Sequence, residues 1–282
     1  MGGAMAATLG RAGFDVVVWN RDAAKAERVG TEAGARVAAS AAAAAAQADV
    51  VITSLADDEA VRAVYLGDSG VAAGIRPGAV ALDTSTVDPG TQQVVGAAID
   101  AVGAGFLDCP VSGDVSRVQV GGLTIMVGGD PALLERVRPI LEALAARIIH
   151  VGGRGTGAAT KLAVNALVHG INVSLSEAVV LAEKAGVDRA IAYEVFASGA
   201  GGAPYVHYKR AAFADPDAAT VAFSIALVAK DLSLITGLGE RVGAPMQQAA
   251  TGLDIVRRAI AKGYGERDLS AIAAFLREEG SR

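Results

Sequence analysis

Short apolar runs alternate with segments of helical periodicity through the first half of the chain. Residues 14–19 form a buried-strand pattern that follows a helix-like stretch ended by Gly13. Further strands are predicted where apolar residues cluster, at 49–55, 79–83, 105–108 and 123–127. Strands that alternate with helices predict a largely parallel sheet covered by helices on both faces.

The second half of the chain lacks this alternation. A weakly charged run at 155–186 predicts one long helix, and further helices are predicted at 189–198, 223–242, 246–262 and 269–279. The intervening stretch 204–210 is expected to be a loop that carries polar aromatic side chains. The pattern therefore predicts an α/β domain over residues 1–152 and an all-helical domain over residues 153–282.

Composition narrows the range of partners and compartments. The 282 residues are 52% hydrophobic and 20% charged, which suffices for two domains with sizeable cores. A net charge of −5 argues against a nucleic-acid or anionic-membrane surface. No uncharged stretch reaches the roughly 20 apolar residues of a membrane span, and the N-terminus does not read as a signal peptide. We expect a cytoplasmic protein that binds neither membranes nor nucleic acids.

Cysteine and histidine positions give no sign of a metal centre. The single Cys109 excludes an internal disulfide framework, and we expect a packed thiol there rather than a nucleophile. His150, His169 and His207 are scattered without partnering cysteines, so we expect no bound metal. His169 is expected to be a hydrogen-bonded interface histidine, with a second proton donor as the alternative.

Lys161 and Asn165 are the first candidates for chemistry. They lie four residues apart in the long predicted helix and therefore on one face of it. The chain has 19 arginines and only 6 lysines, and lysine is the cation whose pKa can move into a range useful for proton transfer. The alternative is a lysine whose stem packs while its ammonium group reaches water.

Polar residues follow the predicted strands, at the edge where a parallel sheet binds its ligands. Asn20 and Arg21 follow the first strand, Ser54 and Leu55 end the second, and Thr86 comes shortly after the third. These five residues are candidates for binding a dinucleotide cofactor.

Asn20 and Arg21 bear on the choice of cofactor. The position of Asn20 ordinarily carries an acid that binds the 2′-hydroxyl of NAD, whereas an arginine there binds the 2′-phosphate of NADP. Asn20 followed by Arg21 therefore favours NADP over NAD. An Arg21 that stacks on adenine, or a role for Asp22 at the ribose, would instead fit NAD.

The glycine-rich turn of a dinucleotide-binding fold is incomplete. The chain opens Met1-Gly2-Gly3 and passes directly into the first helix. An intact Gly-x-Gly-x-x-Gly turn begins about 20 residues before the ribose-binding position, so Gly2 takes the place of the third glycine. We expect the first strand and two glycines to be absent from this chain. Met1 and Gly2 are then the candidates from this turn for cofactor binding.

Five segments in register resemble one family. They are 83–86 (DTST), 106–113 (FLDCPVSG), 123–129 (LTIMVGG), Gly157-x3-Lys161-x3-Asn165 and 230–232 (KDL). Together they resemble the β-hydroxyacid dehydrogenases, which include 3-hydroxyisobutyrate dehydrogenases and tartronate semialdehyde reductases. The resemblance covers nearly the whole chain. It implies a Rossmann-type domain, a long bridging helix and an all-helical substrate and oligomerisation domain, with the active site in the cleft between the domains.

The resemblance also implies catalytic roles. Lys161, at the start of the bridging helix, would be the general acid/base that protonates a carbonyl oxygen or accepts a hydroxyl proton. Asn165 would hydrogen-bond the substrate oxygen. The hydroxyl of Ser112 and the backbone of Gly113 would hold the substrate carboxylate.

Cofactor and partner follow in the same way. Thr86 would lie near the nicotinamide, and Lys230 would reach the cofactor or the substrate. The predicted function is NAD(P)-dependent hydride transfer between nicotinamide and a short β-hydroxy acid or its semialdehyde. The predicted assembly is a homodimer or homotetramer.

One departure from the family keeps alternatives open. Asp114 stands where the family usually has another glycine, and a carboxylate there would repel an acidic substrate unless it faces solvent or pairs with Arg117. An imine reductase-like enzyme is the nearest rival, although such enzymes usually replace the lysine found here at Lys161. The incomplete glycine turn also permits a noncatalytic, oligomerising scaffold.

Overall fold

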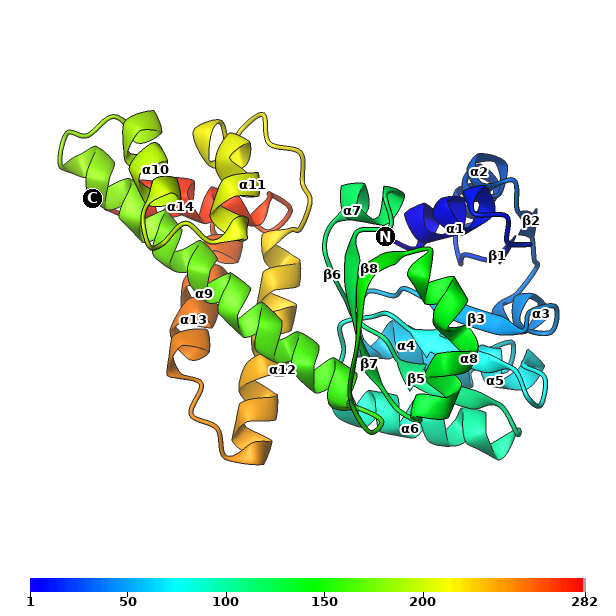
Figure 1. Ribbon diagram of the computed structural model, residues 1–282. Helices are drawn as coiled ribbons and strands as arrows, with labels where there is room; N and C mark the ends of the chain where they lie inside the picture. Colours follow the sequence, from blue (N-terminus) through cyan, green and yellow to red (C-terminus); the bar gives the residue numbers. More distant parts are fainter. Residues whose placement is uncertain (281–282) are drawn as a thin grey trace. The chain divides into compact units, whose positions relative to one another are not determined.

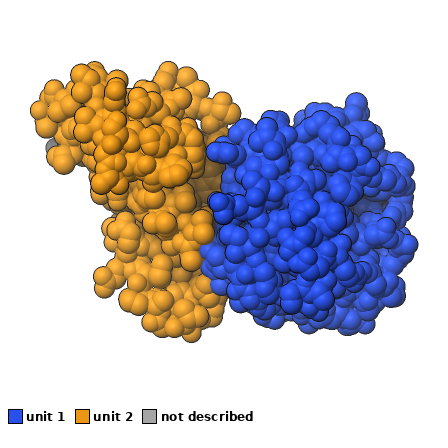
Figure 2. All heavy atoms as spheres, in the orientation of Figure 1, with its two compact units in different colours: residues 1–161 blue, residues 162–282 orange. Residues whose placement is uncertain are grey.

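The computed structural model describes residues 1–280, which divide between two compact units. The first unit comprises Met1–Lys161 and the second begins at Leu162, as coloured in Figure 2. The division falls inside helix α9 (Thr156–Lys184), which is continuous from one unit into the other. An α/β part followed by an all-helical part was predicted, and this fold class is confirmed.

Strands and helices alternate through the first unit (Figure 1). The strands are β1 (Val17–Val18), β2 (Arg36–Val37), β3 (Val50–Thr53), β4 (Val80–Asp83), β5 (Gly105–Asp108), β6 (Val111–Ser112), β7 (Leu123–Gly128) and β8 (Ala145–Gly152). The helices are α1 (Gly2–Arg11), α2 (Ala23–Ala33), α3 (Ala41–Ala45), α4 (Asp58–Leu66), α5 (Val71–Gly74), α6 (Pro89–Ala101), α7 (Val115–Gln119) and α8 (Pro131–Glu142).

Aspartate side chains fix where several of these helices begin. Asp57 accepts a hydrogen bond from the Ala60 N–H at the start of α4, and Asp22 accepts one from the Lys25 N–H at the start of α2. A carboxylate at this position satisfies an otherwise unpaired N–H and interacts favourably with the helix dipole. Asp88, Asp114 and Asp130 cap α6, α7 and α8 in the same way.

The strands of the first unit form two sheets. β1 and β2 pair in parallel in one, and the other has the order β3-β4-β5-β7-β6 with β8 also paired to β7. Among the described residues, β1 pairs only with β2, and β3 only with β4. The β3-β4, β4-β5 and β7-β8 pairs are parallel, whereas β7 runs antiparallel to β5 and β6. The prediction of a largely parallel arrangement is correct for the strands that precede β6.

Both faces of the central strands are buried. In β4, Val80 and Leu82 join one apolar cluster, while Ala81 between them joins another that includes Phe106 of β5. Successive side chains of a strand point to opposite faces, so strands buried on both faces read as continuous apolar runs. This is why the sequence revealed these strands.

Three strands escaped prediction. β2 and β6 have two residues each, which is too short for a periodic pattern. β8 is longer, but half of its residues are exposed and these include Arg147 and His150. A strand with only one buried residue, interrupted by an arginine and a histidine, does not produce the apolar run that identified the others.

All regular elements of the second unit are helices, within the part of the chain that the structure describes. Beyond the rest of α9 it contains α10 (Arg189–Ser198), α11 (Pro204–Ala214), α12 (Ile225–Val242), α13 (Gln247–Ala261), the short 3-10 helix η1 (Leu269–Ala271) and α14 (Ile272–Glu279). Four of these follow the predicted segments closely. The expected loop at 204–210 was wrong, because these residues lie in α11. Lys209 occupies one of the buried positions of α11 and interrupts the apolar periodicity that would have marked a helix.

Among the described residues, only α9 has the length and apolar composition to cross a membrane, with a mean hydropathy of 1.4 over its most apolar window. Core helices of soluble proteins share this length and apolar composition. The polar side chains of α9 at Asn165, Asn172 and Ser176 are buried and hydrogen-bonded. We interpret α9 as the core helix of the second unit.

Candidate active site

Asp83 organises the carboxyl ends of strands β3 and β4. Its fully buried carboxylate accepts hydrogen bonds from Thr53 Oγ1 at 2.6 Å, Ser85 Oγ at 2.7 Å and Gln92 Nε2 at 2.5 Å. Burial raises the pKa of Asp83, and the three donors offset part of that rise. The donors make a buried carboxylate tolerable and fix the residues that follow both strands.

The candidate cofactor residues of the two strands are joined through Ser85. Its hydroxyl oxygen accepts the Leu55 N–H at 2.9 Å, and Ser54 and Thr86 are the direct neighbours of these two residues. A Cβ atom on Gly2 would lie 3.3 Å from the Ser54 Cβ, so the start of α1 approaches the same edge closely. Gly2, Ser54, Leu55 and Thr86 therefore gather at one edge of the first unit.

The start of α1 has the features of an anion-binding helix end. Its N-cap residue is Met1, and no side chain caps its first N–H groups. Unpaired N–H groups and the positive end of the helix dipole attract phosphate, and the small Gly2 permits a close approach. These features fit the pyrophosphate of a dinucleotide.

A hollow of about 600 Å³ lies beyond the ends of β1 and β2. Trp19, Asn20 and Arg21 line it together with Glu27, Val37 and several alanines. Its size and partly apolar lining suit an adenosine group. The Asn20 and Arg21 predicted to bind the cofactor thus lie side by side at a suitable hollow.

Asp22 is engaged elsewhere. Its carboxylate caps α2 through the Lys25 N–H at 3.2 Å, and its other oxygen lies 3.6 Å from the Lys25 Nζ. The same residue's N–H donates to Asn20 Oδ1 at 2.9 Å. The acid that could have favoured NAD therefore already serves as a helix cap.

Ser112 and Gly113 follow strand β6. Gly113 has φ of +132°, and a Cβ atom there would lie 2.8 Å from Leu123 Cδ2. Both observations require glycine at this turn. The half-buried Ser112 therefore precedes a backbone that can approach a ligand closely.

Asp114 is an exposed helix cap. Its carboxylate accepts hydrogen bonds from Ser116 Oγ at 2.6 Å and from the Arg117 N–H at 3.1 Å at the start of α7. The Ser116 hydroxyl contributes most to lowering the pKa of Asp114. Its charge is thus engaged at the start of its own helix.

Asp108 at the end of β5 anchors the helix that carries Lys161. Its two carboxylate oxygens accept the N–H groups of Gly155 and Ala158, each at 2.8 Å. A Cβ atom on Gly157 would lie 2.6 Å from the Asp108 carbonyl oxygen, and one on Gly128 would lie 2.5 Å from Asp108 Oδ1. Glycines at 128 and 157 leave room for this cap. α9 begins at Thr156, so Lys161 lies in its second turn rather than at its start.

A polar cluster surrounds Asp231 inside the second unit. Its fully buried carboxylate accepts the Asn165 Nδ2 hydrogen bond at 2.5 Å, and His169 Nε2 lies 3.4 Å from the same oxygen. The other oxygen lies 2.9 Å from Lys230 Nζ. Burial raises the pKa of Asp231, but His169 and Lys230 outweigh it, so the pKa falls below its ordinary value. The half-buried Lys161 lies one turn before Asn165 on the same helix.

The predicted residues of the second unit are thus brought together through one carboxylate. Asn165 and Lys230 both contact Asp231, and the expectation that His169 is hydrogen-bonded is confirmed. Asp231 belongs to the KDL segment, residues 230–232, but the sequence predicted no role for it. Its position next to Lys230 was the available signal, but its bond to a residue 66 positions earlier is invisible in the sequence.

The polar face of α9 continues beyond this cluster. Asn172 Nδ2 donates to the Leu269 carbonyl at 3.1 Å, and Asn172 Oδ1 accepts the Tyr205 hydroxyl at 2.7 Å. Ser176 donates to the Asn172 carbonyl at 2.7 Å. Asn165, His169, Asn172 and Ser176 therefore form a buried polar seam along one side of the helix.

Cys109 has no sign of reactivity. It is fully buried next to Asp108, and burial raises its pKa well above the ordinary thiol value. A thiolate nucleophile needs a lowered pKa and access to substrate, so a packed thiol is confirmed. Among the described residues there is no cluster of three or more His, Cys, Asp or Glu side chains that could hold a metal ion.

Two family models match the chain over nearly its whole length. The NAD binding domain of 6-phosphogluconate dehydrogenase matches residues 1–152. The NAD-binding domain of NADP-dependent 3-hydroxyisobutyrate dehydrogenase matches residues 155–276.

Individual proteins resemble the chain over the same span. Glyoxylate/succinic semialdehyde reductase 2 of Arabidopsis thaliana is 33% identical over 100% of this chain and 78% of its own length. An NAD-dependent L-serine dehydrogenase of Pseudomonas aeruginosa is 33% identical over 96% of this chain and 93% of its own. Among solved structures, the Mycobacterium tuberculosis 3-hydroxyisobutyrate dehydrogenase with L-serine superposes with a TM-score of 0.87 at 34% identity, covering 98% of this chain and 96% of that one.

Proposed function

The chain belongs to the β-hydroxyacid dehydrogenase family, and on this premise we propose that it transfers a hydride between nicotinamide and a short β-hydroxy acid or its semialdehyde. The observation that carries the proposal is the arrangement on α9. Lys161 lies one turn before Asn165, whose amide is held by a buried carboxylate. A half-buried lysine beside an oriented amide side chain is suited to transferring a proton to an oxygen atom of a substrate.

Residues of the first unit would hold the cofactor. Met1 and Gly2 would meet the pyrophosphate at the start of α1, and Ser54, Leu55 and Thr86 would line its path along the strand ends. Asn20 and Arg21 would take the adenosine end in their hollow. When bound, nicotinamide supplies or accepts the hydride.

We infer a preference for NADP over NAD. Arg21 is exposed at the rim of the hollow, where a guanidinium can pair with a 2′-phosphate. Asp22 caps α2 and is paired with Lys25, and Glu27 of α2 is the one acid among the residues that line the hollow. The preference therefore depends on Arg21 and on Asn20, which stands where an NAD-binding fold ordinarily carries an acid.

Lys161 would move the proton. In reduction its ammonium group donates a proton to the carbonyl oxygen of the substrate, and in oxidation its amine accepts the hydroxyl proton. Asn165 would orient that oxygen through its amide. Asp231 is a positioning residue here, because its bond to Asn165 Nδ2 fixes which way the amide faces.

Ser112 and Gly113 would hold the substrate carboxylate through a hydroxyl and a backbone N–H. The positive φ of Gly113 allows the chain to turn there without a side chain in the way. The Asp114 carboxylate accepts hydrogen bonds from Ser116 and from the start of α7, so its negative charge would not be directed at a ligand bound at this turn. An acidic substrate is therefore compatible with this loop.

We also propose that the protein forms a homodimer or homotetramer through α9. The side of α9 opposite the polar seam carries Leu167, which is 67% exposed, and Leu181, which is 72% exposed. Exposed Ala163 and Ser174 lie on the same side, because they follow the helical repeat. A second copy of the same helix would cover this face and satisfy the symmetry of a closed dimer.

The test is a substrate panel with both cofactors. L-Serine, 3-hydroxyisobutyrate, glyoxylate, succinic semialdehyde and one cyclic imine would be assayed with NADP(H) and NAD(H) by nicotinamide absorbance. We expect turnover of at least one hydroxy acid or semialdehyde, faster with NADP(H). Turnover of the imine alone would favour an imine reductase, and absence of cofactor binding in a fluorescence titration would favour the scaffold.

Lys161→Met should lower kcat by about 10²- to 10⁴-fold in that assay, the usual share of a general acid/base. Lys262→Met is the matched control, because Lys262 is an exposed lysine at the end of α13. Equal activity of the two variants would contradict the assigned role of Lys161.

A further inference from the structure

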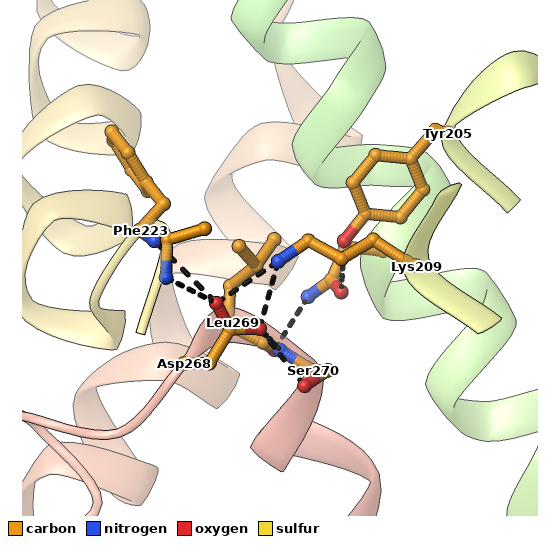
Figure 3. Close-up of polar contacts among 8 residues, drawn as sticks. Tyr205, Lys209, Phe223, Asp268, Leu269 and Ser270 are labelled. Atoms are coloured by element: carbon orange, nitrogen blue, oxygen red, sulfur yellow. Dashed lines mark hydrogen bonds and ion pairs between the residues drawn. The ribbon is translucent and has the colours of Figure 1, made fainter. Parts of the chain in front are cut away.

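A buried ion pair lies in the second unit among residues to which the proposed function assigns no role (Figure 3). Lys209 of α11 is 6% exposed, and its Nζ lies 2.9 Å from both carboxylate oxygens of Asp268. Asp268 is 2% exposed and precedes η1. Lysine is scarce in this chain, and Lys209 lies in the interior rather than on the surface.

Asp268 also holds the backbone that leads into α12. Its Oδ2 accepts the N–H groups of Ala222 at 3.0 Å and Phe223 at 3.4 Å. The Phe223 carbonyl in turn accepts the Leu269 N–H at 2.9 Å. Figure 3 shows these bonds converging between the η1 segment and Phe223. Both backbone polar groups of Phe223 are thereby fixed.

The Phe223 side chain leads to the candidate catalytic cluster. Its ring centroid lies 5.9 Å from that of His169, with an angle of 32° between the planes. His169 contacts Asp231, and Asp231 accepts the bond from Asn165. A continuous set of contacts therefore runs from Lys209 to Asn165 within one unit.

Stability alone explains the ion pair poorly. Two buried charges lose their hydration, and a pair of apolar side chains of similar volume often serves a core equally well. Ala222 and the preceding Val221 are exposed, and Phe223 is only partly buried, so packing does little to fix this segment. An anion that accepts two backbone N–H groups does fix it, and Lys209 neutralises that anion.

We propose that Lys209 and Asp268 are positioning residues that hold the Phe223 ring against His169 and so fix one wall of the site shared by Asn165 and Lys230. The catalytic part of this inference rests on the proposed function. The structural part, a mechanical link between the ion pair and the His169 ring, is testable without any activity.

The structural test is the NMR signal of the His169 ring protons, assigned by its loss in His169→Gln. Phe223→Leu removes the ring current of Phe223 and should shift these signals. Lys209→Met should shift them in the same direction, whereas Lys209→Arg, which keeps the charge, should restore most of the wild-type position. Unchanged His169 signals in a folded Lys209→Met protein would overturn the proposal.

Glu183→Gln is the matched control. Glu183 of α9 forms part-buried ion pairs with Arg189 and Arg277, far along the helix from His169. Its loss should lower the melting temperature without moving the His169 signals. If Lys209→Met does not fold, Ser270→Ala replaces it, because the Ser270 hydroxyl bonds Asp268 at 2.9 Å. That variant should shift the signals less but in the same direction, and no shift would again overturn the link.

Kinetics with the best hydroxy acid of the panel test the catalytic part. Lys209→Met should raise KM by roughly 3- to 30-fold, with a smaller change in kcat, the range expected for coupled neighbours. In a protein that already carries Phe223→Leu, adding Lys209→Met should not raise KM further, because the ring that Lys209 positions is already absent. Any effect of Glu183→Gln on KM should instead be independent of Phe223→Leu, so that the two effects add in the double variant. Additive effects of Lys209→Met would overturn the positioning role, while a wild type inactive on every substrate would sink the proposed function and leave the NMR result standing.

Discussion

Buried aspartates place the side chains on which the proposed chemistry depends. Asp83 fixes the ends of β3 and β4, Asp108 fixes the start of α9, and Asp231 fixes Asn165. A buried carboxylate is costly unless donors surround it, and each of these has several. These three carboxylates orient neutral side-chain donors and backbone N–H groups as well as charged side chains. Fixed donors of this kind suit a site that must hold a substrate oxygen atom in one place.

At residue scale, Asp231→Asn should impair catalysis more than stability. An asparagine can present its oxygen to only one side, so its amide N–H groups would face either the Lys230 ammonium or Asn165 Nδ2, and Lys230 would lose its ion-pair partner in both cases. The loss of a hydrogen bond to a charged group, about 2 kcal/mol, corresponds to roughly a 30-fold fall in kcat/KM. Steady-state kinetics and a thermal melt would measure both effects.

Asp254→Asn is the control for that variant. Asp254 is 72% exposed in side chain and pairs with Arg258 on the surface of α13. A surface pair contributes little, so kinetics should stay at the wild-type level. Wild-type kinetics for Asp231→Asn as well would refute its positioning role.

The candidate site could be predicted from the sequence only as far as its local motifs reach. Lys161 and Asn165 follow from a four-residue spacing, and Asn20 and Arg21 follow from their place after a strand. Asp231 and Phe223 acquire their roles from contacts with residues more than 50 positions away. Such contacts leave no periodic trace, so the chemistry was predictable but its supporting residues were not.

At the scale of elements, the start of α9 shows why one glycine is needed. Gly157 passes so close to the Asp108 and Met126 carbonyl oxygens that a Cβ atom would lie 2.6 and 2.9 Å from them. These are backbone atoms of β5 and β7, which cannot move without disturbing the sheet. Helix α9 can therefore be tied to the strands only through a residue without a side chain.

Gly157→Ala should accordingly destabilise the protein by about 1–3 kcal/mol, the usual cost of overpacking. Gly153→Ala is the matched control four residues earlier, where a Cβ atom would meet nothing within 4 Å. Its effect should stay within about 1 kcal/mol of neutral, since alanine also restricts the unfolded chain. Urea unfolding of both variants would measure the difference, and equal stabilities would contradict the account of the α9 start.

Elements were predictable where burial is strong on a periodic face. β4 and β5 are buried on both sides and were located within a residue, and α10 was located at its observed bounds. α11 was missed because Lys209 takes a core position, and β8 was missed because only one of its residues is buried. In both cases the tertiary structure reverses the usual burial of a residue: the charged Lys209 is buried in α11, and the apolar Ile149 is exposed in β8.

At the scale of the whole molecule, α9 has two different sides. Its buried side carries the polar seam that leads to Asp231, and its opposite side exposes Leu167 and Leu181. A helix that binds the substrate on one side and a second copy on the other would couple assembly to the geometry of the site.

The oligomer is testable by light scattering. The chain has a mass of 28.2 kDa, and we expect the wild type to run at twice or four times that value at micromolar concentration. Leu167→Glu should shift it towards the monomer, because a charge would be buried in the apolar contact. Val242→Glu, at an equally exposed apolar position on α12, should leave the mass unchanged. A monomeric wild type would contradict the proposal.

The most direct test of the central claim is the pH dependence of kcat/KM for the wild type and for Lys161→Arg. An arginine keeps the positive charge but does not release its proton in the working range. If Lys161 transfers the proton, one ionisation of the wild-type profile should disappear in the variant, and its turnover should fall by about 100-fold or more. A Lys161→Arg protein with near-normal turnover and an unchanged profile would contradict the mechanism.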